Sequence, residues 1–464
     1  MKRKIWLSAI TMNSSGHISP GLWAHPRDKS ADYTDLEYWT ELARTLERGK
    51  FDALFLADAT GIHDVYRGSA DAALAQGVGA PINDPFLVVP AMAVVTDHLG
   101  FGITGTVTYE PPYLFARRIT TLDHLTKGRI AWNIVTGYLD SAAKGAGLLN
   151  QSSHDDRYDV ADEYMEVVYK LWEGSWEDDA VVRDKKNRVF ADPAKIHKVQ
   201  HSSKHFQLDA YHLSEPSPQR TPVLFQAGAS NRGVDFAAKH AEAVFITGPS
   251  KNVVKARVDD VRKRTAALGR DPLATLIITL MTVIPGRTDE EALAKYEDYQ
   301  RYADLEGALS VFGAWTGIDF STYDFDAPLE YIESNAIQSR IADFTDDNSR
   351  AWTVREVGRF MEIGGPAPII VGSAERVADE LIGWVEETGI DGFNLAYALS
   401  PESYIDFVDL VVPELQRRGV YKQDYEASTL RETLRGPGQA RLPEDHPGAQ
   451  FRAAPVQAPQ RKIA

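Results

Sequence analysis

The sequence predicts an α/β fold of the closed (β/α)8 TIM-barrel class, in which eight parallel strands alternate with helices. Short and uniformly apolar runs recur along the chain, and such runs are typical of strands that are buried on both faces. Amphipathic helical patterns follow most of them. Several runs also end in a polar residue and a loop, and barrel active sites are built at that edge. An open doubly wound sheet shows the same alternation, but the chain has no G-x-G-x-x-G motif after its first strand.

The individual elements follow from these patterns. The predicted strands are residues 4–9, 52–58, 100–104, 129–135, 222–227, 243–246, 276–283 and 392–396. Apolar residues between Tyr38 and Leu46 recur at helical spacing, and Gly49 ends that helix. A second helix is predicted over 155–172, and a third begins after Ser373 as its cap. The polar residues at strand ends are Asp58, Thr104, Asn133 and Gln226.

Two regions do not fit the eightfold plan, although we expect a single domain over residues 1–464. Residues 305–368 break the rhythm, and we interpret them as an insertion over the barrel mouth, at the carboxyl-terminal face, where substrate-covering elements occur. A surface excursion without function is the alternative. Residues 420–464 lack helical periodicity, so we expect a C-terminal arm that wraps another surface or frays.

Composition narrows the possible functions. The 464 residues are 44% hydrophobic, which is enough for a large core. The net charge of −16 disfavours nucleic-acid and membrane-surface partners. The absence of cysteine excludes disulfides, cysteine metal sites and thiol nucleophiles. No apolar run approaches the roughly 18 residues of a membrane-spanning helix, and the N-terminal run is too short for a secretory signal. We therefore expect a cytoplasmic protein.

Residues 222–233 contain the first candidate anion-binding segment. They read as a strand, a turn of small residues and the start of a helix. Such a turn offers free backbone N–H groups and the positive end of a helix dipole. The Ser230 hydroxyl adds a donor, and Arg232 lies within one turn of it. A plain capped helix start remains the alternative interpretation.

The second candidate is the pair His154 and Tyr158. If a helix begins near residue 155, the two side chains share one face and can donate hydrogen bonds to one anion. The alternative is an acidic first turn that suits the helix dipole, with Arg157 in solvent.

His17 is the candidate acid–base residue, because it lies in the loop after the first strand, where a barrel has its mouth. It is equally readable as an ordinary loop histidine. The chain has no H-E-x-x-H motif, no G-x-S-x-G elbow and no phosphate-binding P-loop, so no metal site is predicted. Polar strand ends and anion donors without a nucleophile suit an enzyme whose chemistry belongs to an organic cofactor.

Longer blocks resemble a known family, the bacterial-luciferase-like flavin monooxygenases. The resemblance is closest to the nitrilotriacetate and dibenzothiophene sulfone monooxygenase branch, and within it to the long-chain alkane and dimethyl sulfide enzymes, a group associated with xenobiotic degradation. It covers nearly the whole chain. The blocks are ERGKFD (47–52), LFLAD (54–58), TLDHLTKGR (121–129), WNIVT (132–136), HDDRY (154–158) and FQAGAS (225–230).

This resemblance implies a monooxygenase that binds reduced FMN, supplied by a separate NAD(P)H:flavin oxidoreductase, and that uses O2 as a co-substrate through a flavin C4a-peroxide. It places Asp58 and Thr104 near the isoalloxazine ring. It assigns the ribityl chain and phosphate to His154, Tyr158, Ala229 and Ser230, with Asn133 as a further contact. It also implies a homodimer or a larger homo-oligomer.

The substrate remains open at this stage. A flavin peroxide must be kept from water, so we expect aromatic pocket walls, with Trp6, Tyr138, Phe312 and Trp315 as candidates. The alkane enzyme has other residue types at three pocket positions, where this chain has Ser14, His63 and Tyr138. The resemblance therefore does not carry over alkane hydroxylation, and a small organosulfur or other apolar substrate is the broader expectation. The alternatives are an F420-dependent oxidoreductase on the same barrel and a non-catalytic flavin-binding protein.

Overall fold

The computed structural model describes residues 4–228, 230–329, 336–337, 344 and 351–452, and within them eight parallel strands close into a ring. The pairing of β10 with β11 and that of β1 with β13 complete the closure. All eight predicted strands are confirmed, with ends shifted by a few residues. They are β1 (Trp6–Met12), β2 (Ala53–Ala57), β3 (Gly100–Thr106), β4 (Ile130–Val135), β9 (Val223–Gln226), β10 (Ala243–Ile246), β11 (Leu276–Gly286) and β13 (Gly392–Ala396).

The register of the ring sets which side chains meet at its mouth. Thr104 of β3 lies opposite Asn133 of β4, and Asn133 lies opposite Phe225 of β9. Because every strand runs in the same direction, the polar residues at their carboxyl ends lie at one end of the barrel.

Helices cover the outside of the ring and bury their apolar faces against it. The α1 helix illustrates how the sequence fixes a helix start, because Asp35 accepts a hydrogen bond from Glu37 N at 3.0 Å and caps the first turn. The predicted helix over 155–172 is α6, which ends at Tyr169 and continues as a π turn over Lys170–Gly174. The helices are α1 (Leu36–Arg48), α2 (Asp71–Gln76), α3 (Val89–Val94), α4 (Pro112–Leu125), α5 (Asp140–Gly145), α6 (His154–Tyr169), α7 (Asn231–His240), α8 (Lys251–Ala267), α9 (Asp289–Gln300), α10 (Leu305–Thr316), α12 (Val354–Met361), α13 (Ala374–Thr388), α14 (Glu402–Asp406), α15 (Val412–Arg417) and α16 (Leu430–Arg435).

One helix prediction needs refinement. Ser373 takes the cap position before α13, but its side chain makes no capping hydrogen bond. Among the residues that the structure describes, no helix has both the length and the apolar character that crossing a membrane requires.

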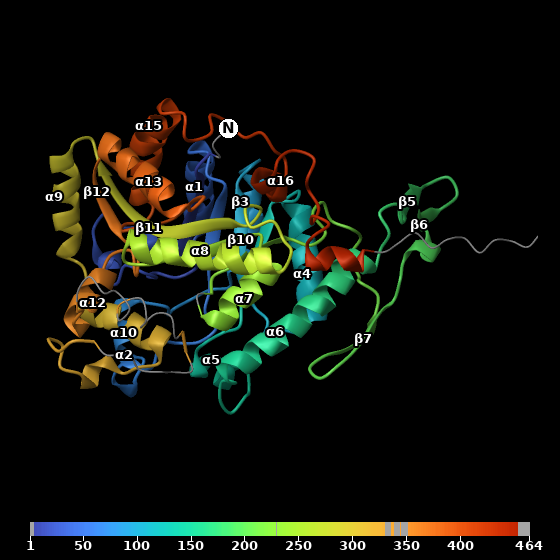
Figure 1. Ribbon diagram of the computed structural model, residues 1–464, viewed down its shortest axis with the longest axis horizontal. Coiled ribbons are helices and arrows are strands. Elements are labelled where there is room, and N and C mark those ends of the chain that lie inside the picture. The colour runs from blue at the N-terminus through green and yellow to red at the C-terminus, as the bar shows by residue number, and fades with distance from the viewer. Residues whose placement is uncertain (1–3, 229, 330–335, 338–343, 345–350, 453–464) are drawn as a thin grey trace, which may run out of the picture.

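Several strands were not predicted. β12 (Ile369–Ser373) joins the outer edge of β11. Two hairpins, β5 (Val181–Asp184) with β6 (Val189–Ala191) and β7 (Val199–Ser202) with β8 (Gln207–Ala210), lie between β4 and β9 and extend from one side of the barrel in Figure 1. These hairpin strands are short and largely exposed, so they lack the continuous apolar run on which the strand predictions depended.

Residues 305–368 include α10 and α12, which gather with α2 on the side of the barrel away from α16 (Figure 1). They have an aromatic core of their own, in which Phe312 stacks on Phe320 with ring centroids 4.8 Å apart and Phe344 packs edge-on against Trp352. The role of this insertion as a substrate cover stays a prediction.

The C-terminal arm covers the opposite end of the barrel. The sequence of the arm shows no helical periodicity, yet a short helix, α16, forms in it over six residues, too few for a periodic pattern to appear. Leu430 and Leu434 of this helix pack against the first residues of the strands, among them Trp6 and Ala53. The chain at Gly100 makes room for this contact, since an added Cβ there would lie 2.5 Å from Leu430 Cδ1.

A buried ion pair attaches α16 to the closed end of the barrel. The Arg431 guanidinium donates to both carboxylate oxygens of Glu242 at 2.8 and 2.9 Å, and both side chains are fully buried. Arg431 also donates to the carbonyl oxygens of Thr221 and Pro222 at the start of β9. The arm is therefore bonded directly to the barrel wall.

We predict that Arg431→Met lowers the free energy of unfolding by about 3 kcal/mol, because Glu242 keeps a buried charge with only the longer contacts to Arg435 Nε, at 3.2 Å, and to the Leu224 N–H group, at 3.1 Å. Urea denaturation followed by tryptophan fluorescence measures the change. Lys144→Ala, which removes an exposed pair with Asp140, is the control and should leave the urea midpoint close to that of the wild type. Equal effects of the two substitutions would show that the ion pair between Arg431 and Glu242 does not stabilise the fold.

Candidate functional site

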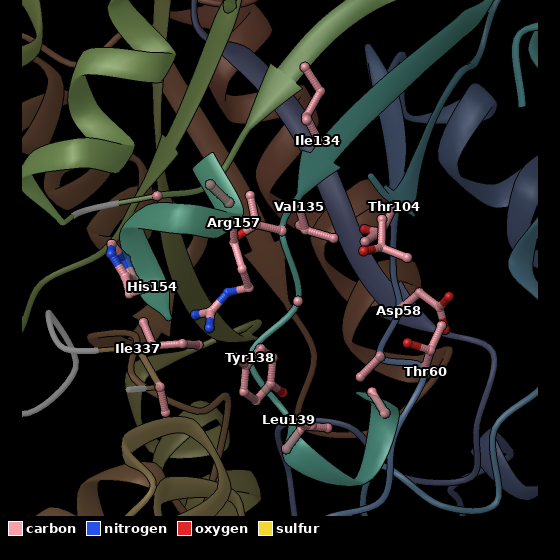
Figure 2. A pocket seen from close by; sticks show the side chains of 18 of the residues that line it. Asp58, Thr60, Thr104, Ile134, Val135, Tyr138, Leu139, His154, Arg157 and Ile337 are labelled. Atoms are coloured by element: carbon pink, nitrogen blue, oxygen red, sulfur yellow. The ribbon is translucent and has the colours of Figure 1, made fainter. Parts of the chain in front are cut away.

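Two adjoining cavities, which share several lining residues, lie at the carboxyl ends of the strands. The first extends toward the start of α7, and the second extends into the barrel. Figure 2 shows the first cavity, with His154 and Arg157 on one side and Asp58, Thr60 and Thr104 on the other. Both cavities are lined by Asp58, Ala59, Thr104, Val135, Tyr138, Ala227 and Ile337.

Hydroxyl groups converge at one end of the first cavity, where α7 begins. Ser230 caps α7 by accepting a hydrogen bond from Gly233 N at 3.0 Å. A Cβ added at Gly233 would lie 2.8 Å from Tyr158 Oη and 3.0 Å from Ser230 Oγ, so the two hydroxyls face the same point. Burial raises the pKa of Tyr158, so its ring keeps the O–H donor at neutral pH. This end is a cradle of donors beside a positive helix end.

Arg157 adds a positive charge to that cradle. Its side chain is only 2% exposed and points into the cavity beside His154 in Figure 2. It donates to the Ser152 carbonyl at 2.5 Å, and His154 Nδ1 lies 2.8 Å from the Asp155 carboxylate. The interpretation that places Arg157 in solvent is wrong, because the first turn of α6 packs inward.

Arg232 does not join the cradle, although the sequence places it one turn from Ser230. Its guanidinium donates to Asp159 and Asp162 of α6, at 3.0 and 2.8 Å. It therefore ties α7 to α6 on the outer side, and its charge is already paired.

The other side of the cavities holds polar groups that suit a flat heteroaromatic ring. Asn133 Nδ2 donates to Thr104 Oγ1 at 3.0 Å, and both residues are 3% exposed. The Asn133 carboxamide oxygen is buried and has no hydrogen-bond partner in the structure. A buried acceptor in this state is stabilised by a ligand N–H group.

Asp58 lies at the junction of both cavities and of a third opening toward Asp84. Burial raises the pKa of its carboxyl group to about 7, and the nearby Asp84 carboxylate adds to the effect. The Ala59 N–H group opposes it by donating a hydrogen bond. Asp58 can therefore exchange a proton near neutral pH.

His17 lines the second cavity, where His63 also lies. Burial lowers the pKa of His17 to about 3, and the neighbouring His63 ring contributes to the shift. The imidazole is therefore neutral at physiological pH and is available to accept or relay a proton.

The structure thus brings most of the predicted site residues to one continuous cavity. Ala229 lies outside the described residues. Of the expected aromatic walls, Tyr138 and Trp315 line the second cavity. Trp6 and Phe312 do not: Trp6 lies at the closed end of the barrel, and Phe312 lies in the insertion core. Among the described residues, no group of three or more acidic or histidine side chains is arranged to hold a metal ion.

The fold and the site define a class of protein: a closed parallel barrel with its cavities at the carboxyl ends of the strands, where barrel enzymes have their active sites. The particular family follows from comparison with known proteins. The chain belongs to the luciferase-like monooxygenase family, whose profile matches residues 12–392.

Named relatives support this assignment over almost the full length. The chain is 51% identical to dimethyl-sulfide monooxygenase of Hyphomicrobium sulfonivorans, over 98% of this chain and 95% of the relative. It is 50% identical to long-chain alkane monooxygenase of Geobacillus thermodenitrificans, over 97% and 99%.

Solved structures agree. A structure of long-chain alkane monooxygenase superposes with a TM-score of 0.90 and covers 97% of this chain and all of its own. A riboflavin lyase structure, solved with modified FMN and riboflavin, is 37% identical with a TM-score of 0.92, over 97% of this chain and all of its own. The predicted luciferase-like barrel and the predicted flavin-dependent monooxygenase class are confirmed.

Asp58 yields a test of the site's electrostatics. Because its folded-state pKa is raised to about 7, the folded protein binds a proton that the unfolded chain releases above about pH 4. Stability that comes from this proton is lost as the pH rises from about 4 to about 7. We predict that Asp58→Asn becomes more stable than the wild type by about 2 kcal/mol across this window, and that the difference then stays constant.

Urea denaturation at pH 4.5, 6 and 8 measures this difference. Asp97→Asn, at an exposed carboxylate, is the matched control and should track the wild type. A difference between Asp58→Asn and the wild type that does not change with pH would contradict the buried carboxyl group.

Proposed function

We propose that the protein is the oxygenating component of a two-component system. A separate NAD(P)H:flavin oxidoreductase supplies reduced FMN, and the protein transfers one atom of O2 to a small apolar or organosulfur substrate. The observation that carries this proposal is one continuous cavity with anion donors at one end and an unpaired carboxamide oxygen at the other. The family resemblance supports the reductase partner and a homodimer or larger assembly.

The residues present fit FMN on the geometry of this chain. Tyr158, Ser230 and the first N–H groups of α7 would hold the phosphate, with Arg157 supplying the positive charge. Glycine is needed at Gly228 and Gly233, because an added Cβ at either position would lie 2.8 to 3.0 Å from Tyr158 Oη and would push that hydroxyl out of place.

The ring would lie across the mouth of the barrel. The unpaired Asn133 carboxamide oxygen and the Asp58 carboxyl group would accept hydrogen bonds from its polar edge. Reduced FMN, when bound, supplies the electrons that activate O2 for transfer of one oxygen atom. The protein's own residues position the ring, exclude water and manage protons.

Water exclusion follows from the barrel interior. Phe55 and Phe245 line the second cavity with ring centroids 4.7 Å apart, and Phe225 packs against both. Trp315 of α10 lines the same cavity from the insertion. These aromatic walls would exclude water from the place where oxygen transfer occurs. His17 holds a neutral imidazole at this cavity and is our proposed acid–base residue.

The apolar lining supports the substrate class. Ile10, Met12 and Leu280 line the second cavity beside the aromatic rings. The relatives' names, a dimethyl sulfide and an alkane monooxygenase, supply two starting compounds for a substrate screen.

The direct test mixes the purified protein with FMN, NADH, a generic flavin reductase and O2, and follows loss of candidate substrates. We expect oxygenated product only when reductase and O2 are both present. Turnover without reductase, or with reduced F420 alone, would contradict the proposal.

The phosphate site is tested separately by Ser230→Asp. Aspartate is as good a helix cap as serine, so α7 is retained, but its charge repels the phosphate. We predict that the dissociation constant for FMN rises at least about 100-fold, measured by fluorescence titration, while riboflavin, which has no phosphate, binds as before.

Ser250→Asp is the matched control, because Ser250 caps α8 by the same kind of hydrogen bond, from Val253 N, and does not line the cavity. Equal FMN affinity in the wild type and Ser230→Asp would place the phosphate elsewhere.

A further inference from the structure

His63 is a buried imidazole for which the described structure provides no hydrogen bond. Its residue is 4% exposed, and its Nδ1 atom is buried without a partner. The ring lies against the backbone of Gly79, where an added Cβ would lie 2.7 Å from His63 Cε1. It also lines the second cavity. Buried polar groups are nearly always hydrogen-bonded, so this ring requires an explanation.

His17 repeats the same feature from the opposite loop. Its Nδ1 atom is also buried without a hydrogen-bond partner, and it lines the same cavity. The loops after β1 and β2 each contribute one of these rings. Two imidazoles with buried, unsatisfied nitrogens carry a desolvation cost that a ligand with a polar atom would remove.

Both rings are neutral in this environment. Burial lowers the pKa of His63 to about 4 and that of His17 to about 3. A neutral imidazole has one N–H donor and one acceptor nitrogen, and it offers no charge to pair with a carboxylate. The chamber is therefore suited to an uncharged oxygen acceptor on an apolar body.

We propose that His17 and His63 form a neutral donor pair that binds the oxygen atom of a small uncharged substrate carrying a carbonyl, sulfoxide or sulfone group. This inference rests on the proposed function, since it assigns the second cavity to the substrate. Ile10, Met12 and Leu280 contact the apolar body, and the imidazole N–H groups select the polar end.

The other ionisable groups at this cavity are consistent with an uncharged ligand. Asp58 and Tyr138 line it and carry no positive charge. Arg257 also lines it, and its guanidinium donates to the Thr247 carbonyl. An anionic substrate would lie near the Asp58 carboxyl group, and the carboxylate probe in the experiment tests whether the Arg257 charge outweighs that repulsion.

The experiment uses the protein loaded with oxidised FMN, so that no turnover occurs, and probes of one ring size. Sulfolane carries two sulfone oxygens, tetrahydrothiophene carries a sulfide, cyclopentane has no polar atom, and cyclopentanecarboxylate is anionic. Saturation-transfer NMR measures their affinities. We expect sulfolane to bind at least about tenfold more tightly than cyclopentane, and the carboxylate to bind most weakly.

Substitution and spectroscopy identify the groups responsible. His63→Phe keeps a ring but removes both nitrogens, and it should reduce the preference for sulfolane over cyclopentane at least about threefold. His205→Phe, at an exposed position in the turn between β7 and β8, is the control and should leave the preference unchanged. In the wild type, sulfolane and not cyclopentane should shift the imidazole ¹⁵N resonances of His63 and His17, which gives a readout that does not require the variant to fold.

The outcomes separate this inference from the proposed function. If FMN does not bind, the proposed function fails. If FMN binds but sulfolane and cyclopentane bind equally, if the carboxylate binds best, or if the imidazole resonances do not move with sulfolane, the neutral donor pair is overturned.

Discussion

Closure of a parallel ring is the constraint on which the rest of this molecule depends. Because all eight strands run in one direction, the residues that end β2, β3, β4 and β9 are forced to one face, although they are far apart in the chain. The same constraint leaves the other end of the barrel to be sealed. The chain seals it with α16, whose Arg431 is bonded to Glu242 in the wall. A ring that is open at one end and sealed at the other is what makes the cavities at the mouth a protected chamber.

Burial then sets the chemistry of that chamber. The protein as a whole carries a net charge of −16, yet the end of the chamber that we propose for the phosphate contains Arg157 and the start of α7. Toward the barrel interior, burial raises the pKa of the Asp58 carboxyl group. Burial also lowers the pKa values of His17 and His63, so both imidazoles are neutral. A charged tail and a neutral reacting end can therefore be bound a short distance apart, because each environment favours a different charge state.

The parts of the fold that the sequence predicted are those with uniform local signals. Apolar runs located all eight barrel strands, and the spacing of His154 and Tyr158 placed both residues correctly at one cavity; their role in binding an anion stays a prediction. The hairpins between β4 and β9, β12 and α16 were missed, because short or exposed elements lack periodicity. Arg157 was misjudged because burial of a charged side chain depends on tertiary packing that its neighbours in sequence do not reveal. The resemblance placed His63 at a pocket position, but not beside the cavity wall of His17, because that requires two loops from different strands to meet.

A crystal structure of the protein with FMN tests most directly whether the cavities at the barrel mouth bind the cofactor. We expect the phosphate to lie within hydrogen-bonding distance of Tyr158 Oη and Ser230 Oγ. We expect the ring to lie beside Thr104 and Asn133, with its reactive face toward the cavity that His17 and His63 line. A flavin whose phosphate lies away from the start of α7, or whose ring lies outside the barrel mouth, would contradict these expectations.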